Sequence, residues 1–547
     1  MKLLNKFLKR TEFEDYADFK EHFEINVPED FNYVRDVIDV LAEEKPNKLA
    51  LLYCNDEGEE QRFTFGDVAR YSKQIAAYFA AKGIGAGDSV ITLLRRRWEY
   101  WMIAVALHRL GALLVPGSIQ LMKKDIAYRV EAAQAKMIVA IDDAFVLEQL
   151  EGQQIESETL EHILIVGENT GAYEDFHASF DQYGTYEGCA KRKQDDSFIA
   201  YFTSGTTGYP KMAVHNQTYA LGHIVTAKYM QCVRDGGLHL TLADSGWAKF
   251  GWGNLYGQWI AETAILAYDP IRFQSKNLMH IMEKYAPTTL CIPPTMYRFL
   301  LNDGVEKKHI ASIEWYSTAG EPLSPKVNEA FFALSGHEIH EGFGQSEGTP
   351  ITCSYEWLEV RPGSMGKPSP LYDVAIVDKE GMPLEAGESG EVIIYTDGKK
   401  TPIGLLAGYI IDGVFTRGYD EIYHTGDIAY ADEDGYYWYV GRNDDMIKCS
   451  GYRIGPFEIE SVLNTHPAIK ESAIVGRPDE LRGQVVCAVV ALREGFAPSD
   501  ALTKELQEYV KTNTAPYKYP RIVEYMEALP KTTSGKIIRN VLTNKEG

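Results

Sequence analysis

The chain has 547 residues, of which 45% are hydrophobic, 24% charged and 12% aromatic. This length exceeds what a single hydrophobic core usually supports, so we expect at least two domains. With 55 basic and 78 acidic residues, the formal net charge is −23. Such an acidic chain is a poor candidate for non-specific binding to nucleic acid or to anionic membranes. A phosphorylated substrate would have to be attracted by local cations.

Cysteine usage and apolar runs bear on the cellular compartment. The seven cysteines are scattered and form no Cys-x-x-Cys pair, so we expect neither a disulfide framework nor a zinc site, and we infer a reducing, cytoplasmic location. Residues 1–10 are basic and partly apolar, but acidic residues follow at once, which favours a surface helix over a targeting segment. No apolar run is long enough to span a bilayer.

Helical and strand-like patterns alternate along the chain as far as Arg361. Residues 68–79 carry apolar side chains at helical spacing, Gly83 ends that run, and residues 98–110 form a second predicted helix. Short apolar runs predict strands at 89–94, 113–115, 137–140, 163–166, 198–203, 238–242, 264–268, 289–292 and 314–318. Strands that alternate with helices are typical of an α/β fold, here with mixed, largely parallel sheets flanked by helices.

The pattern changes after Arg361, where Gly and Pro become frequent. Residues 372–377 and 391–395 predict strands of a β-rich subdomain. We place a domain boundary at a polar run, which gives an N-terminal domain of residues 1–440, a hinge of residues 441–445 and a small mobile C-terminal domain of residues 446–547. The C-terminal domain is predicted to be α+β, with helices at 456–464 and 499–512 and strands at 469–475, 484–492 and 522–526.

The most informative motif is the segment 203–211, Thr-Ser-Gly-Thr-Thr-Gly-Tyr-Pro-Lys. It follows a predicted strand, and its two glycines let the backbone turn tightly and approach a ligand. Its hydroxyls and backbone N–H groups can surround phosphate oxygens, while Lys211 adds positive charge. The Gly-x-x-Gly-x-x-Lys spacing differs from the Walker form. We therefore predict a polyphosphate-binding loop of another kind.

Further polar clusters follow in chain order: residues 320–322, residues 341–347, residues 423–427 with Arg442, and residues 531–536. Phe343 offers a flat apolar face for a purine, and Glu347 offers an oxygen ligand for Mg²⁺. Asp427 can accept hydrogen bonds from ribose hydroxyls, and Arg442 can reach the ribose or a phosphate. Each residue alone would be an ordinary turn or surface group, but their occurrence together and in this order indicates a nucleotide site.

Taken together, these motifs resemble those of the adenylate-forming (AMP-binding) superfamily of acyl-CoA synthetases, luciferases and non-ribosomal adenylation domains. The resemblance covers essentially the whole chain. Similarity to the medium-chain acyl-CoA synthetase branch lies in residues 212–213, 244–247, 450–456 and 477–483. The fold implied is a large N-terminal domain followed by a small mobile one.

The resemblance implies a role for each motif. The β- and γ-phosphates would be bound by Thr203, Ser204, Gly205, Thr206, Thr207, Gly208 and Lys211. The adenine would be lined by Gly320, Glu321 and Pro322, with Phe343 stacking on it. Further cofactor-binding residues would be Gly344, Gln345 and Ser346. Mg²⁺ would bind Glu347, and the ribose would bind Asp427 and Arg442. The mobile catalytic lysine would be Lys536, and the hinge residue would be Asp444. Ser450 and Gly451 would line the path of the pantetheine arm of CoA.

The activity implied by the resemblance is ATP-dependent acyl-CoA synthesis, with ATP, Mg²⁺ and CoA as cofactors. A carboxylate attacks the α-phosphorus of ATP to give acyl-AMP and pyrophosphate, and the CoA thiol then displaces AMP. Charge crowds the reacting oxygens, so positioning and electrostatic stabilisation should dominate catalysis. The expected partners are small molecules, and the sequence leaves the oligomeric state open.

The identity of the acid is predicted from one position. In acetate-specific relatives a tryptophan directly before the motif glutamine closes the acyl pocket, and here that position is Gly344. We therefore expect a medium-chain, branched or aryl carboxylate. Several nearby aromatic residues either line this pocket or fill the core: Trp247, Trp252, Tyr256 and Trp259.

Two other functions are compatible with the same residues. A ligase that loads a carrier protein would share every ATP-binding group and differ only in the thiol acceptor. A non-catalytic nucleotide-binding relative is disfavoured because the charged groups Lys211, Glu347, Asp427 and Lys536 are all present.

Overall fold

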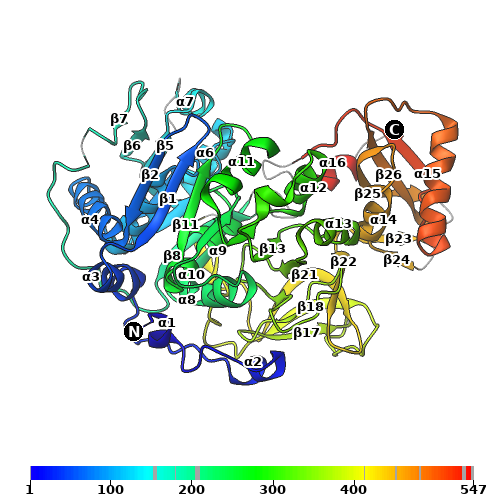
Figure 1. Cartoon of the computed structure of the whole chain (residues 1–547), viewed down its shortest axis with the longest axis horizontal. Coiled ribbons are helices and arrows are strands. Elements are labelled where there is room, and N and C mark those ends of the chain that lie inside the picture. Colours follow the sequence, from blue (N-terminus) through cyan, green and yellow to red (C-terminus); the bar gives the residue numbers. More distant parts are fainter. Residues whose placement is uncertain are drawn as a thin grey trace.

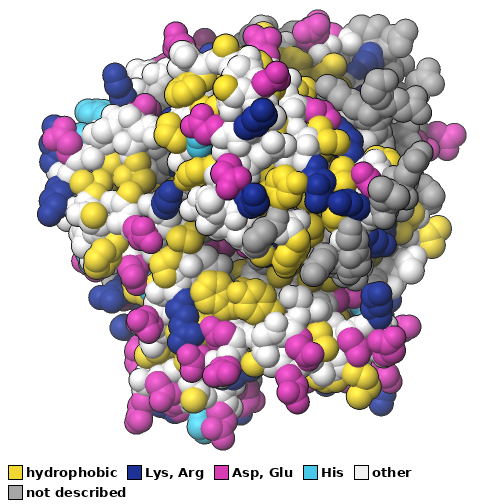
Figure 2. All heavy atoms as spheres, turned by 90° about the vertical axis from the view of Figure 1, so that its right-hand side faces the viewer, with side chains coloured by type: hydrophobic (Ala, Val, Ile, Leu, Met, Phe, Trp, Pro, Cys, Tyr) yellow, Lys and Arg dark blue, Asp and Glu magenta, His cyan; other side chains and the backbone are white. Residues whose placement is uncertain are grey.

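The computed structural model describes residues 2–151, 157–178, 180–203, 210–411, 413–449, 452–479, 482–531 and 537–543. Within these residues a large lobe, blue to yellow in Figure 1, is followed by a smaller C-terminal lobe in orange and red. Figure 2 shows acidic side chains spread widely over the face that includes the smaller lobe, with Lys and Arg among them. The predicted α/β fold class is confirmed.

Two large sheets, A and B, dominate the described part of the large lobe. In spatial order, sheet A contains β16 (Lys367–Pro368), β15 (Thr352–Cys353), β14 (Ile339–Phe343), β13 (Trp315–Ala319), β12 (Thr289–Cys291), β10 (Leu238–Thr241), β11 (Ala264–Asp269), β1 (Leu49–Asn55) and β2 (Glu60–Thr64). Sheet B contains β20 (Val414–Thr416), β19 (Gly408–Ile411), β9 (Lys211–Asn216), β8 (Ser197–Thr203), β4 (Leu113–Pro116), β3 (Ser89–Leu93), β5 (Ala135–Ile141), β6 (His162–Val166) and β7 (Glu174–Asp175). The central strands are parallel and the outer pairs include antiparallel ones, as in mixed sheets whose faces are covered by helices.

Two smaller sheets, C and D, follow in the chain. Sheet C is the predicted β-rich subdomain and contains β17 (Asp373–Val377), β18 (Gly390–Tyr395), β21 (Ile422–Ala431) and β22 (Tyr437–Arg442). Sheet D belongs to the C-terminal lobe and contains β24 (Tyr452–Ile454), β23 (Ile447–Cys449), β26 (Gly483–Leu492) and β25 (Ile469–Asp479), with β27 (Ile522–Tyr525) paired to β26. Strand β22 includes Gly441 and Arg442, so the first two residues of the expected hinge are part of sheet C.

Helices cover these sheets. In the large lobe they are α1 (Leu4–Phe7), α2 (Tyr16–His22), η1 (Val34–Asp39), α3 (Val40–Glu44), α4 (Phe65–Ala81), α5 (Trp98–Leu110), α6 (Lys123–Ala133), α7 (Ala144–Leu150), α8 (Tyr219–Ile224), η2 (Val225–Met230), α9 (Ala248–Asn254), α10 (Gly257–Ile260), α11 (Ser275–Tyr285), α12 (Pro294–Asn302), η3 (Lys307–Ile310) and α13 (Pro325–Ser335). In the smaller lobe they are α14 (Pro456–Leu463), α15 (Asp500–Asn513), η4 (Pro516–Lys518) and α16 (Arg539–Thr543).

Local chemistry explains where one predicted helix begins and where another ends. Helix α4 begins at a capping box, in which the Asp67 backbone N–H donates to Thr64 Oγ1 and the Thr64 N–H donates to the Asp67 carboxylate. Helix α5 ends at Gly111, which adopts a φ of 70° that favours glycine. Every residue of α5 is buried, as expected for a helix that is apolar on most of its surface.

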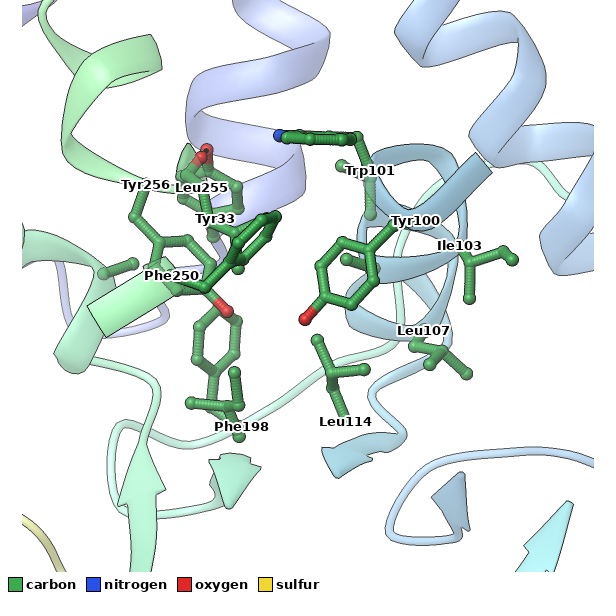
Figure 3. Close-up of a cluster of buried hydrophobic side chains, with 14 of the residues drawn as sticks. Tyr33, Tyr100, Trp101, Ile103, Leu107, Leu114, Phe198, Phe250, Leu255 and Tyr256 are labelled. Atoms are coloured by element: carbon green, nitrogen blue, oxygen red, sulfur yellow. Dashed lines mark hydrogen bonds between the residues drawn. The ribbon is translucent and has the colours of Figure 1, made fainter. Parts of the chain in front are cut away.

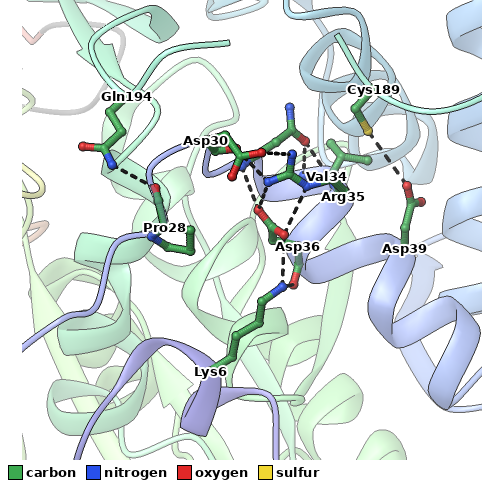
Figure 4. A network of polar contacts seen from close by, with 10 residues as sticks. Lys6, Pro28, Asp30, Val34, Arg35, Asp36, Asp39, Cys189 and Gln194 are labelled. Atoms are coloured by element: carbon green, nitrogen blue, oxygen red, sulfur yellow. Dashed lines mark hydrogen bonds and ion pairs between the residues drawn. The ribbon is translucent and has the colours of Figure 1, made fainter. Parts of the chain in front are cut away.

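The N-terminal segment differs from the expected surface helix. Helix α1 has only four residues, and its Leu4 and Phe7 side chains are buried in the main core. Figure 4 shows Lys6 reaching Asp36 of η1, where its Nζ donates to the carboxylate at 3.0 Å. The segment therefore packs onto the large lobe because its apolar side chains complete that core.

The C-terminal lobe has hydrophobic clusters of its own, which cover sheet D. It meets sheet C where the Phe457 ring lies 6.1 Å from that of Tyr439 and where Gly455 packs so closely on Val440 that a Cβ would lie 2.2 Å from its carbonyl oxygen. Among the described residues, none of the helices combines the length and the apolar character needed to cross a membrane.

Candidate active site

Two of the sequence motifs lie at one edge of sheet A. Strands β13 and β14 are parallel neighbours, with Ala319 opposite Gly342. The chain leaves both strands at their carboxyl ends, so residues 320–322 and residues 344–347 emerge side by side. This edge is where parallel α/β sheets commonly bind ligands.

The first of these segments is held by side chains of α12. Gly320 turns the chain with a φ of 95°, and Glu321 accepts a hydrogen bond from Thr295 Oγ1 at 2.8 Å. Arg298 Nη2 in turn donates to Thr295 at 2.8 Å. On the facing strand, burial raises the pKa of Glu341 to about 8, so this carboxyl group is mostly protonated at neutral pH.

The predicted ribose residues face each other in sheet C. Asp427 on β21 pairs in register with Arg442 on β22, and Arg442 Nη1 lies 3.4 Å from the Asp427 carboxylate. Asp427 is buried and also accepts hydrogen bonds from Gln345 Nε2 at 2.5 Å and Tyr439 Oη at 3.2 Å. Because Gln345 follows β14, this contact joins the motif of sheet A to the motif of sheet C.

The adenine-stacking candidate lies in the same place. Phe343 ends β14, and its ring centroid is 6.0 Å from that of Tyr439. Tyr439 therefore touches Phe343 and also donates a hydrogen bond to Asp427. A base and its ribose could thus be bound by neighbouring side chains.

The loop lysine and the predicted metal ligand meet at one tyrosine. Lys211 begins β9 and pairs in register with Thr203 on β8, and its Nζ lies 5.6 Å from the ring centroid of Tyr409. The Tyr409 hydroxyl donates to Glu347 Oε1 at 3.1 Å. Burial raises the pKa of Glu347, which means that the ionised carboxylate lacks full compensation from the protein alone. A cation delivered with a triphosphate would supply it.

Some predicted residues lie outside the described part of the chain: Ser204, Gly205, Thr206, Thr207, Gly208, Ser450, Gly451 and Lys536. Only the two ends of the phosphate loop are therefore placed, by Thr203 and Lys211. Asp444 is described; it is exposed and its carboxylate lies 3.4 Å from Arg442 Nε.

Three tyrosines were absent from the predicted site residues. Tyr409 holds Glu347, Tyr439 holds Asp427, and the Tyr423 hydroxyl donates to Gln345 Oε1 at 2.7 Å. The signal available in the sequence was weak, because the local pattern of a strand does not reveal a side-chain partner that lies 12, 62 or 78 positions away. Only the pairing of β9 with β19 and the packing of sheet C against β14 bring them to the site.

The aromatic residues proposed for the acyl pocket separate into two groups. Trp252 on α9 reaches the nucleotide motif, because a Cβ on Gly344 would lie 2.7 Å from its six-membered ring. Trp259 belongs to the core, where its Nε1 donates to the Ala50 carbonyl at 2.9 Å and its side chain is fully buried. Tyr256 is likewise buried, with its hydroxyl 3.0 Å from His108 Nε2.

A metal ion at this site would depend on the substrate for most of its ligands. Among the described residues, no group of three or more His, Cys, Asp or Glu side chains could hold a metal ion. The predicted ligand Glu347 would therefore offer a single carboxylate, and Mg²⁺ commonly binds through one or two carboxylates together with substrate phosphates.

Comparison with known proteins places the chain in a family. Residues 38–409 match the AMP-binding enzyme family and residues 458–536 match the AMP-binding enzyme C-terminal domain. The mitochondrial acyl-coenzyme A synthetase ACSM3 of Homo sapiens is 37% identical over 556 aligned residues, which cover 99% of this chain and 94% of the relative. The mitochondrial acyl-coenzyme A synthetase ACSM5 of Mus musculus is 37% identical, and the aligned residues cover 95% of this chain and 91% of that relative.

Solved structures agree with this assignment. The anthranilate CoA ligase AuaEII in complex with anthranoyl-AMP has a TM-score of 0.83 at 26% identity, covering 94% of this chain and 97% of the ligase. An acyl-CoA synthetase of Brucella canis has a TM-score of 0.69 at 31% identity, and the match covers 91% of this chain and 92% of the synthetase.

These relatives correct one expectation and confirm another. The inferred cytoplasmic location is contradicted, since the acyl-coenzyme A synthetases that match are named mitochondrial. The spacing of cysteines in a sequence can distinguish a reducing compartment from an oxidising one, but it does not distinguish one reducing compartment from another. The resemblance seen in the motifs is confirmed: the chain belongs to the AMP-binding enzyme family and is an AMP-forming acyl-CoA synthetase.

Proposed function

We propose that this synthetase acts on a medium-chain, branched or aryl carboxylic acid and uses ATP together with Mg²⁺. One observation carries the proposal: the indole of Trp252 lies against Gly344. In the sequence of the nucleotide motif, Gly344 stands between Phe343 and Glu347. An aromatic wall at the nucleotide site suits an apolar acyl group. The depth of the pocket is then set by Trp252 of α9 in place of a side chain at position 344.

In the first half-reaction, the substrate carboxylate attacks the α-phosphorus of ATP and pyrophosphate leaves. Asp427 and Arg442 would hold the ribose, Phe343 would stack on the adenine, and Lys211 would neutralise charge on the phosphates. Lys536 would bridge the carboxylate and the α-phosphate, a role supported by the family resemblance. Preorganised positive charge of this kind is the main source of catalysis where oxygens crowd a reacting phosphorus.

Glu347 would hold Mg²⁺ from the protein side. The donor fits, because the half-buried Glu347 has a pKa raised by the partial loss of solvent and receives one hydrogen bond from Tyr409. Bound Mg²⁺ would offset the negative charge of the pyrophosphate.

In the second half-reaction, the CoA thiol attacks the acyl carbonyl and AMP leaves. The C-terminal domain would have to rotate, because the family resemblance implies that Lys536 would occupy space that the thiol needs. Asp444 is the proposed hinge residue, since it is exposed and lies two residues after the end of β22. A few residues at the end of an element can absorb such a motion.

A panel of carboxylic acids tests the proposal. Purified protein is incubated with ATP, Mg²⁺ and CoA, and AMP and acyl-CoA are measured for acids from acetate to medium-chain, branched and aryl examples. We expect the highest kcat/KM for an acid larger than acetate, with acyl-CoA formed in proportion to AMP. A preference for acetate would contradict the proposed acid, and faster transfer to a carrier protein than to CoA would contradict the proposed acceptor.

A further inference from the structure

Three buried polar atoms next to the nucleotide motif form no hydrogen bond of ordinary geometry with the residues that the structure describes: the hydroxyls of Tyr201 and Tyr219 and the indole Nε1 of Trp252. The exposed fractions of these side chains are 2%, 0% and 5%. Buried polar groups are nearly always hydrogen-bonded, and each exception requires a specific explanation. A ligand that supplies the missing partner is one such explanation.

The neighbouring tyrosines show that the absence of partners is local. Figure 3 shows Tyr33, Tyr100 and Tyr256 in an adjoining cluster of buried aromatic and aliphatic side chains. Their hydroxyls are all within hydrogen-bond distance of a partner: the Leu255 carbonyl at 2.9 Å, the Ser245 carbonyl at 3.4 Å and His108 Nε2 at 3.0 Å. Packing in this region therefore does not prevent a tyrosine from being satisfied.

The unpartnered atoms converge on one turn of α9. A Cβ on Gly251 would lie 2.6 Å from the Tyr201 hydroxyl and 3.8 Å from the Tyr219 hydroxyl. Trp252 is the next residue, and the Tyr219 phenol interacts weakly with both the Trp252 indole and the Tyr201 hydroxyl. Among the described residues, none gives these three groups a hydrogen bond of ordinary geometry. The groups come from β8, α8 and α9, so only the fold brings them together.

Two contacts tie these groups to the nucleotide site. The Trp252 ring lies against Gly344. The Tyr219 ring lies 3.9 Å from the imidazole of His215, whose Nε2 is 2.8 Å from the Ser346 carbonyl oxygen. Because burial lowers the pKa of His215 to about 4, this imidazole is neutral and its Nε2–H donates to that carbonyl. The unpartnered atoms therefore adjoin the segment that would hold the adenylate.

We propose that Tyr201, Tyr219 and Trp252 recognise an oxygen atom carried by the acyl part of the substrate. This inference rests on the proposed function and names its substrate class more narrowly: a carboxylic acid with a hydroxyl, alkoxy or oxo substituent. An indole N–H can only donate a hydrogen bond, so the ligand atom must be an acceptor. Its two lone pairs can accept from the indole and from one phenol, and the second phenol can donate to the first. An acid without the oxygen leaves these groups buried and unpaired, which is the arrangement that gives an enzyme strong discrimination.

The test uses pairs of acids that match in size and differ in one oxygen. Suitable pairs are methoxy- and ethyl-substituted benzoates, hydroxy- and methyl-substituted benzoates, and straight-chain acids with and without a hydroxyl or oxo group, at several positions. The readout is kcat/KM for AMP formation. For at least one position we expect the native protein to favour the oxygen-bearing acid by about tenfold or more, the usual order for one or more buried hydrogen bonds.

Variants that remove one tyrosine hydroxyl test whether that group causes the preference for the oxygen-bearing acid. Tyr219→Phe and, independently, Tyr201→Phe should bring the ratio within each pair close to one, mainly by lowering kcat/KM for the oxygen-bearing acid. The matched control is Tyr355→Phe, because the Tyr355 hydroxyl is also buried and unpartnered but packs beside the N-terminal segment. This control should leave the ratio unchanged.

Stability measurements separate recognition from a structural role. Since no described residue forms a hydrogen bond of ordinary geometry with either hydroxyl, Tyr201→Phe and Tyr219→Phe should unfold at the same temperature as the native protein or higher. The inference is overturned if the native protein shows no preference within any pair, or if the ratio survives in both variants, as it would if an ordered water filled the site. In either case the preference for acids larger than acetate would persist, whereas failure of the proposed function would appear as a preference for acetate over every larger acid.

Discussion

Gln345 and Asp427 are 82 positions apart in the chain, and the Gln345 amide nitrogen donates to the Asp427 carboxylate at 2.5 Å. This bond links the end of β14 in sheet A to β21 in sheet C. Since Phe343 and Glu347 flank Gln345, the groups expected to hold base, ribose and metal share one connected structure. The following predictions test that structure and the chemistry proposed for it.

Asp427→Asn should raise the KM for ATP by about 10- to 100-fold, because hydrogen bonds to a charged group contribute about 1.5–3 kcal/mol. The thermal midpoint should change little if the amide keeps its contacts with Gln345 and Arg442. The matched control is Asp434→Asn, an exposed carboxylate in the turn before β22 that pairs with Arg361. An unchanged KM in Asp427→Asn would remove this residue from the ribose site.

Glu347→Gln should slow the first half-reaction by about 10²- to 10³-fold, the usual effect of deleting one preorganised electrostatic group. It should also raise the Mg²⁺ concentration that gives half-maximal rate. Tyr409→Phe keeps the ring beside Lys211 but removes the hydrogen bond to Glu347, so a smaller shift, of about 10-fold or more in metal affinity, is expected. Chelation of Mg²⁺ should abolish pyrophosphate release in all three proteins, and an unaltered Mg²⁺ dependence in Glu347→Gln would count against this ligand.

Glu341 should make the protein less stable as the pH rises. Its folded pKa of about 8 lies above its ordinary value of 4.5, so between these values the folded state holds a proton that the unfolded state has lost. The associated stability is fully present below about pH 4.5 and is lost as the pH rises through 8.

Glu341→Gln should therefore flatten the fall of the unfolding free energy between pH 5 and 8, where one such group contributes a slope of at most about 1.4 kcal/mol per pH unit. Denaturant unfolding at several pH values measures this slope. The exposed control Glu380→Gln should keep the native slope. Identical slopes in Glu341→Gln and the native protein would show that the carboxyl group is ionised when folded.

Lys536→Ala should reduce adenylation by about 10²- to 10³-fold or more and retain much of the thioester formation from supplied acyl-AMP. The reason is that the lysine stabilises charge only while the carboxylate attacks the α-phosphate. Measuring the half-reactions separately tests this division, and equal damage to both would reject it. Lys531→Ala is the matched control, since that lysine lies in the same terminal motif and pairs with Glu471.

Gly344→Trp should not simply shift the substrate preference of the enzyme toward acetate. The sequence alone predicts such a shift, but Trp252 already lies 2.7 Å from the position of a Cβ at residue 344. A second indole would collide with the first, and overpacking of this kind typically costs about 1–3 kcal/mol or more. We expect the single variant to lose activity with all acids, and Gly344→Trp combined with Trp252→Gly to recover activity with short ones. Activity of the single variant on medium-length acids would contradict the contact.

The elements that could be predicted from the sequence are those with a local cause. The capping box at Thr64 and the glycine at position 111 mark the ends of α4 and α5, and short apolar runs mark the buried parallel strands. The N-terminal segment could not be predicted in the same way, since its Leu4 and Phe7 are buried only by contact with distant residues.

The sequence by itself determined the family, the order of the nucleotide motifs and the chemistry of their side chains, because these depend on residue type and on spacing along the chain. Only the tertiary structure decided which side chains meet. The pairing of Gln345 with Asp427, the position of Tyr409 between Lys211 and Glu347, and the contact of Trp252 with Gly344 all join residues that are far apart in the chain. Such contacts depend on strand register and on the packing of one sheet against another, which a short motif does not encode.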